Sequence, residues 1–137
     1  MLFKNHEKMP LVKVEILKGK ELKFKKILMD VIHQALVEVL LIPKDDRRQR
    51  LYELDGNNFE HLGRSDDYMI IEITMFKGRS NEAKKMLFEE IVKNLTKALH
   101  INGNDITIVI NEQPLENWGI RGGLPANEVN LGFSLNV

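Results

Sequence analysis

A methionine–proline pair at positions 9 and 10 stands directly before the alternating run "LVKVEI". If Met9 is the true start, removal of that methionine leaves Pro10 with a free secondary amine. Such an amine titrates near the α-amino range, and burial or nearby cations lower its pKa further, so it can act as a general base at neutral pH. If Met1 is the start, the Pro10 nitrogen is an amide without basicity, and the residue simply opens an edge strand. These residues alone leave both interpretations open.

Carboxylates and cations gather in two further segments. In "PKDDRRQR", residues 43–50, Asp45 and Asp46 stand between an expected helix and an expected strand. A carboxylate there can orient or deprotonate a water molecule, or it can belong to a solvated turn. In "FKGRS", residues 76–80, Lys77 and Arg79 flank a glycine between a strand and a helix. Two cations beside free helix amides form a site for a substrate carboxylate; the alternative is a surface turn with incidental charge.

The segment "ENWGIRGGLPANE", residues 116–128, holds the single tryptophan and three glycines. This pattern is typical of a shaped loop whose backbone comes close to a neighbour, or of a turn that covers a core edge. Trp118 and Arg121 are therefore further candidates for substrate contact. The four histidines have no metal-ligand spacing, and "GIRGG" lacks the strand-to-helix context of a dinucleotide site. We therefore predict no metal and no cofactor.

The composition bounds the class of protein. The 137 residues suit one domain, and 43% hydrophobic residues are enough for a packed core. Lysine plus arginine equals aspartate plus glutamate, 20 against 20, so no net field favours nucleic acid or an anionic membrane as a partner. The absence of cysteine rules out disulfides and thiolate chemistry and fits a reducing cytoplasm. No apolar run approaches a membrane span, and residues 1–8 lack the features of a secretory leader.

Hydrophobic periodicity predicts the elements that position these residues. Alternation over residues 12–16 indicates a strand, and helical spacing of apolar residues follows over residues 21–41. A short strand is expected in "RRQRLYEL", a long loop in "DGNNFEHLGRSDD", and a strong strand in "YMIIEITMF". Ser80 is a candidate N-cap for a helix over residues 81–100 that "NGND" closes, and "ITIVI" is a further strand before an irregular tail.

The order strand–helix–strand thus occurs twice. It predicts an α/β two-layer sandwich of two consecutive β-α-β units, with a mixed sheet and both helices on one face. Each crossover should join a parallel strand pair. Because the last strands read as apolar on both sides, we expect the uncovered sheet face to be buried by oligomerisation.

Together these pieces resemble the tautomerase superfamily, and most closely its fused two-unit subgroup typified by malonate semialdehyde decarboxylase. "MPLVKVEI" is similar to the family's opening strand, "PKDDRRQ" to the subgroup's proline-to-aspartate-arginine stretch, and "GRSDDYMIIEITMFKGRS" to its second-unit opening. "NWGIRGG" is similar to the closing segment of simpler tautomerases, which packs against a neighbouring subunit. The likeness runs from Met9 nearly to the C-terminus, so residues 1–9 are expected to be an extension or a misassigned start, and residues 10–137 a single domain.

The resemblance implies a catalytic amino-terminal Pro10, Asp46 as the catalytic aspartate, and Arg79 as one of two cations that hold a substrate carboxylate. Lys77 replaces the second arginine, which keeps the charge but loses the bidentate fork. It implies an enzyme that transfers protons on a small keto–enol carboxylic acid, assembled as a homotrimer. The alternatives are a decarboxylase or hydratase of a 3-oxo acid using water activated by Asp46, and a non-enzymatic binding protein if Pro10 stays blocked.

Overall fold

The computed structural model describes residues 10–130. Four strands form one sheet in the order β2-β1-β3-β4, and two helices connect them. The bounds are β1 Leu11–Leu17, α1 Leu22–Leu40, β2 Arg48–Leu54, β3 Met69–Phe76, α2 Asn81–Leu99 and β4 Ile106–Gln113. A two-stranded hairpin, β5 Gly119–Ile120 and β6 Leu124–Pro125, follows. The predicted extension, residues 1–9, and the last residues of the predicted domain lie outside the described residues.

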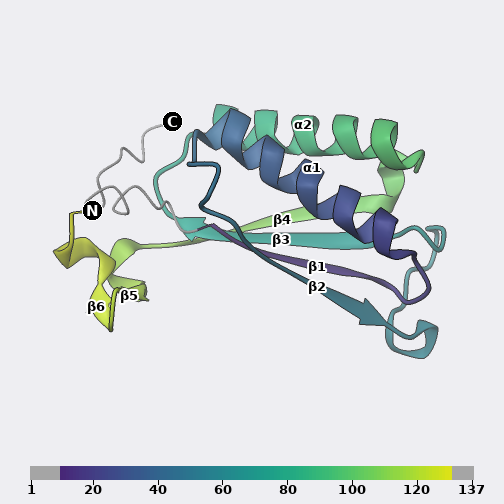
Figure 1. Cartoon of the computed structure of the whole chain (residues 1–137), viewed down its shortest axis with the longest axis horizontal. Helices are drawn as coiled ribbons and strands as arrows, with labels where there is room; N and C mark the ends of the chain where they lie inside the picture. Colours follow the sequence, from purple (N-terminus) through teal and green to yellow (C-terminus); the bar gives the residue numbers. More distant parts are fainter. Residues whose placement is uncertain (1–9, 131–137) are drawn as a thin grey trace.

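The sheet is mixed, as predicted. β1 pairs with β2 in parallel, β3 pairs with β4 in parallel, and the central β1–β3 pair is antiparallel. Each β-α-β unit therefore makes one parallel pair, and the two units meet at the centre of the sheet. Both helices lie on the same face (Figure 1), which confirms the two-layer sandwich.

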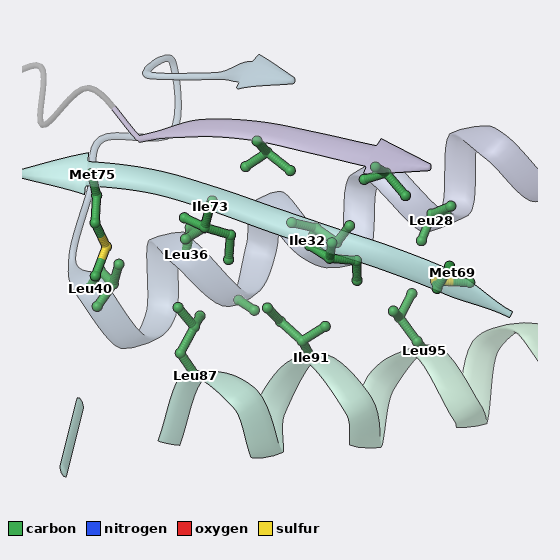
Figure 2. Packing of buried hydrophobic residues seen from close by; sticks show 14 of the residues in the cluster. Leu28, Ile32, Leu36, Leu40, Met69, Ile73, Met75, Leu87, Ile91 and Leu95 are labelled. Carbon is green, nitrogen blue, oxygen red and sulfur yellow. The ribbon is translucent and has the colours of Figure 1, made fainter. Parts of the chain in front are cut away.

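The core lies between the helices and the sheet. In Figure 2, Leu87, Ile91 and Leu95 of α2 extend from one side of the helix toward the strands. Their spacing of four residues places them on one helix face, and all three are fully buried. Burial of each such side chain contributes about 1.5–3 kcal/mol. Alternate residues of the central strands complete the cluster: Val12, Val14 and Ile16 of β1, and Met69, Ile71, Ile73 and Met75 of β3.

The helix ends follow the predicted sequence signals in part. The Ser80 hydroxyl accepts a hydrogen bond from the Ala83 amide at 3.1 Å, which confirms the predicted N-cap of α2. Both helices end on a left-handed residue that is not glycine: Leu41 at φ 57° and His100 at φ 56°. The chain therefore leaves α2 before Gly103, although a glycine is the usual residue for this conformation.

The sheet face away from the helices is more polar than expected. Side chains alternate along a strand, so Lys13 of β1 and Glu72 of β3 both point to this face. They form an ion pair at 3.3 Å, and Asn111 of β4 donates to Glu72 at 3.4 Å. The prediction that β3 and β4 are apolar on both sides is therefore wrong, although Ile70 and Val109 also face this way.

Candidate functional site

The strand directions bring the predicted residues to one end of the sheet. β1 and β2 begin where β3 and β4 end, because the central pair is antiparallel. This end lies at the left of Figure 1. Pro10 is buried immediately before β1, and its neighbour Leu11 lies opposite Arg48 of β2 and Thr74 of β3. The chain between α1 and β2 and the chain between β3 and α2 flank Pro10 at this end.

Asp46 is the buried member of the acidic pair. Its side chain is 1% exposed, whereas Asp45 lies on the surface. A turn holds its backbone, in which the Asp46 amide donates to the Pro43 carbonyl at 3.0 Å. Arg48 donates from Nη1 to Asp46 Oδ1 at 2.5 Å, and its side chain is 38% exposed. A buried carboxylate requires such a partner, because an unpaired buried charge is costly.

Arg79 is buried and Lys77 is exposed, although they are two residues apart. Gly78 between them has a φ of 135°, a backbone conformation that side chains other than glycine rarely adopt. Arg79 is 6% exposed, and this burial lowers the pKa of its guanidinium, while the negative charge of Glu112 acts in the opposite direction. Glu112 itself binds Lys84 of α2 at 2.6 Å.

Trp118 covers the same end of the sheet from the polar face. It packs edge-on against Phe76, with ring centroids 4.8 Å apart at 72°, and its Nε1 donates to the Gln113 carbonyl at 3.3 Å. These residues form a second apolar cluster with Ile120 and Ala126, and Leu11 packs against it. Trp118 therefore belongs to a layer that reaches the residue next to Pro10.

Arg121 lies on the surface of the β5–β6 hairpin, directly after Ile120 of the apolar cluster. It is an exposed residue in the turn between β5 and β6, with a φ of 51°, and it donates to the Asn130 carbonyl at 3.0 Å. Gly122 and Gly123 follow in the left-handed region, at φ 86° and 97°. The three positive-φ residues in a row explain why this segment is rich in glycine.

Two charged residues at this end were missed by the sequence reasoning. Arg48 pairs with Asp46, and a signal for it exists: the two residues are two positions apart across the start of a strand. Glu112 places a negative charge beside Arg79. No local pattern marks it, because it comes from the end of β4 and meets the β3–α2 turn only through the sheet.

Within residues 10–130, no group of three or more His, Asp or Glu side chains is arranged to hold a metal ion. No helix in this range is both long and apolar enough to cross a membrane. A pocket of 330 Å³, lined by Lys18, Lys20, His61 and four other residues, lies at the opposite end of the sheet from Pro10.

A family model described as tautomerase enzyme matches residues 46–121, more than half of the chain. The chain belongs to this family, and it is therefore an enzyme with tautomerase- or decarboxylase-type activity.

Individual relatives agree with this assignment. The protein named probable tautomerase YusQ of Bacillus subtilis (strain 168) is 25% identical over 121 residues, which cover 84% of this chain and 95% of that protein. A 2-hydroxymuconate tautomerase of Comamonas testosteroni is 37% identical over 51 residues, covering 37% of this chain and 81% of that protein.

Solved structures share the fold of the chain over most of its length. FG41 malonate semialdehyde decarboxylase inhibited by 3-bromopropiolate has a TM-score of 0.74 and 30% identity, covering 84% of this chain and 92% of that one. A fused 4-OT wild-type symmetric trimer shares the fold, with a TM-score of 0.77 at 22% identity, covering 90% and 99% of the two chains. The predicted similarity to the malonate semialdehyde decarboxylase group is confirmed.

Proposed function

We propose that this enzyme transfers protons on a small keto–enol carboxylic acid, with Pro10 as the general base after removal of Met9. The observation that carries the proposal is the position of two buried charged side chains, Asp46 and Arg79, at the end of the sheet where Pro10 precedes β1. Charged side chains are rarely buried unless they are paired. Charged groups that are buried in this way are often found at functional sites.

In the proposed reaction, the Pro10 nitrogen takes the proton from the enol hydroxyl of the substrate. The electrons of that O–H bond form the new carbonyl, and the carbon–carbon double bond takes up the proton that the Pro10 ammonium returns. The reaction balances, because one proton leaves the enol oxygen and one proton is added to carbon. Arg79 binds the carboxylate and stabilises the enolate charge in a site shielded from water, and Lys77 adds a second positive charge at its rim.

The direct test uses chain that mass spectrometry shows to begin at Pro10. This processed protein should accelerate the ketonisation of phenylenolpyruvate, which is measured as the loss of enol absorbance. The same preparation is then offered a 3-oxo acid, with carbon dioxide release as the readout. If the protein accelerates neither of the two reactions, this result contradicts the proposed function.

The second candidate function is decarboxylation or hydration of a small 3-oxo acid. Two observations favour it: the buried Asp46 carboxylate, which pairs with the partly exposed Arg48, and the 30% identity to a malonate semialdehyde decarboxylase. In that reaction Asp46 activates water, and a protonated Pro10 acts as acid or electrostatic stabiliser. The pKa of the Pro10 amine decides between the two reactions.

The Asp46→Asn variant distinguishes the two candidates. If Asp46 activates water, the variant should lose about 100- to 10,000-fold in kcat, the range for a removed general base. If Pro10 is the base and Asp46 only assists, the loss should be about 10- to 30-fold, which is below that range. Both values come from steady-state kinetics with the corresponding substrate. Wild-type kcat on both substrates would remove Asp46 from the site.

The chain is further proposed to form a homotrimer. Solved fused 4-OT structures of the same fold are trimers, and the polar sheet face and the β5–β6 hairpin offer surfaces for subunit contact. Multi-angle light scattering at micromolar concentration is expected to give about three times the mass of one chain. A stable monomer would contradict the proposed trimer, but it would not change the assignment of the site residues.

Residues 1–9 are proposed to be a misassigned start or an added segment, since the family chemistry begins at Pro10. The cytoplasmic location remains a prediction from composition.

A further inference from the structure

The segment that carries Asp46 is attached to α1 by three side-chain contacts. His33 Nε2 lies 2.8 Å from the Lys44 carbonyl oxygen. Arg47 donates to Asp30 at 2.6 Å, and Gln49 donates to the Met29 carbonyl at 2.8 Å. The Arg47–Asp30 contact is exposed to solvent, whereas His33 is 7% exposed. Among the three side chains, His33 is buried, Gln49 is half-buried and Arg47 is exposed, so His33 is the most buried of these attachments.

The chemistry of the contact fixes the proton on the ring. A carbonyl oxygen only accepts hydrogen bonds, so Nε2 of His33 carries the hydrogen and donates it. The other ring nitrogen, Nδ1, is buried, and it has no hydrogen-bond partner among residues 10–130. A buried polar atom without a partner is unfavourable. An apolar residue would avoid this cost beside its neighbours Ile32 and Leu36, which lie in the core. Packing alone therefore does not account for a histidine here.

We propose that His33 is a positioning residue for Asp46. It donates to the carbonyl of Lys44, two residues before Asp46, inside the turn in which the Asp46 amide donates to Pro43. The hydrogen bond fixes the backbone of that turn against α1, and Arg48 then holds the carboxylate itself. A displacement of about 1 Å at a reacting group can cost about 100-fold in rate, so a fixed turn matters for catalysis. This inference rests on the proposed function, since it requires Asp46 to act in the reaction.

Two substitutions at position 33 separate the hydrogen bond from packing. His33→Leu fills the space but cannot donate, and His33→Gln places an N–H donor near the position of Nε2. We expect His33→Leu to lower kcat about 5- to 10-fold with KM within twofold of wild type, and His33→Gln to recover most of that loss. Asp30→Asn is the matched control, because it weakens the exposed contact of the same segment, and it should change kcat less than twofold. Thermal unfolding is measured for each variant, and a purely structural role would lower stability without this pattern.

A double-mutant cycle with Asp46→Asn tests whether His33 acts through Asp46. If it does, the double variant is no slower than Asp46→Asn alone, because a misplaced turn cannot impair a carboxylate that is already absent. The inference would be overturned if the kcat losses of the two single variants multiply in the double variant. It would also be overturned if the kcat of His33→Gln is no higher than that of His33→Leu. An impaired Asp46→Asn enzyme beside a fully active His33→Leu enzyme overturns this inference only. A fully active Asp46→Asn enzyme overturns both this inference and the proposed role of Asp46.

Discussion

The Arg79→Ala enzyme is expected to lose about 30- to 5,000-fold in kcat/KM on an enol acid such as phenylenolpyruvate. This range corresponds to about 2 to 5 kcal/mol, the usual loss when one partner of a buried charged hydrogen-bonded pair is removed. Arg79 falls in this class because it is 6% exposed. Its guanidinium is planar and keeps its charge, although burial lowers its pKa. Both KM and kcat should change, since the proposed contact strengthens as enolate charge develops.

The controls for this prediction come from the same turn. Arg79→Lys keeps the charge without the fork and should fall between Ala and wild type. Lys77→Ala removes an exposed cation, so its effect should stay below about tenfold, in keeping with the small energies of exposed charge pairs. Unfolding must be followed as well, because Arg79→Ala removes one of the positive charges near Glu112, whose carboxylate keeps its ion pair with Lys84. Unchanged kcat/KM in folded Arg79→Ala protein would remove Arg79 from the site.

The sequence predicts most of the elements, because hydrophobic periodicity is a local property. The spacing of four between Leu87, Ile91 and Leu95 predicts α2, and the alternation over residues 12–16 predicts β1. β4 extends three residues beyond "ITIVI" to Gln113, since Asn111 and Glu112 still pair with β3. The β5–β6 hairpin was not predicted, because two-residue strands carry no period.

The contrast between neighbouring charges could not be predicted from the sequence. Asp45 and Asp46 are the same residue type, and Lys77 and Arg79 carry the same charge. The sequence alone therefore does not distinguish the two members of either pair. Which member of each pair is buried depends on backbone direction at one turn and on partners from distant strands. Asp46 is buried against Arg48, and Arg79 is buried near Glu112, a residue 33 positions later in the chain. The resemblance to the family predicted that Asp46 and Arg79 are the functional members of these pairs. The local sequence pattern alone does not make this distinction.

The proposed reaction depends on a free amine at Pro10. Ketonisation needs a nitrogen that takes up a proton and returns it. An amide nitrogen cannot do this, because its lone pair is delocalised into the carbonyl. Chain that retains residues 1–9 should therefore show little tautomerase activity that depends on Pro10, and the removed general base alone accounts for a loss of about 100- to 10,000-fold. Pro10→Ala is a weaker test, since processed Pro10→Ala chain still has a primary amine and should keep partial activity.

The most direct measurement compares the two starts side by side. One preparation is expressed from Met1 and the other from Met9, and mass spectrometry verifies that they begin at Met1 and at Pro10. Both are assayed with phenylenolpyruvate at equal concentration, after light scattering and thermal unfolding show that they are equally folded. The proposed reaction predicts activity from the chain that begins at Pro10 and at least about 100-fold less activity from the longer chain. Equal activity from the unprocessed chain would mean that Pro10 is not the base, and Asp46 would then be the residue to test in that role.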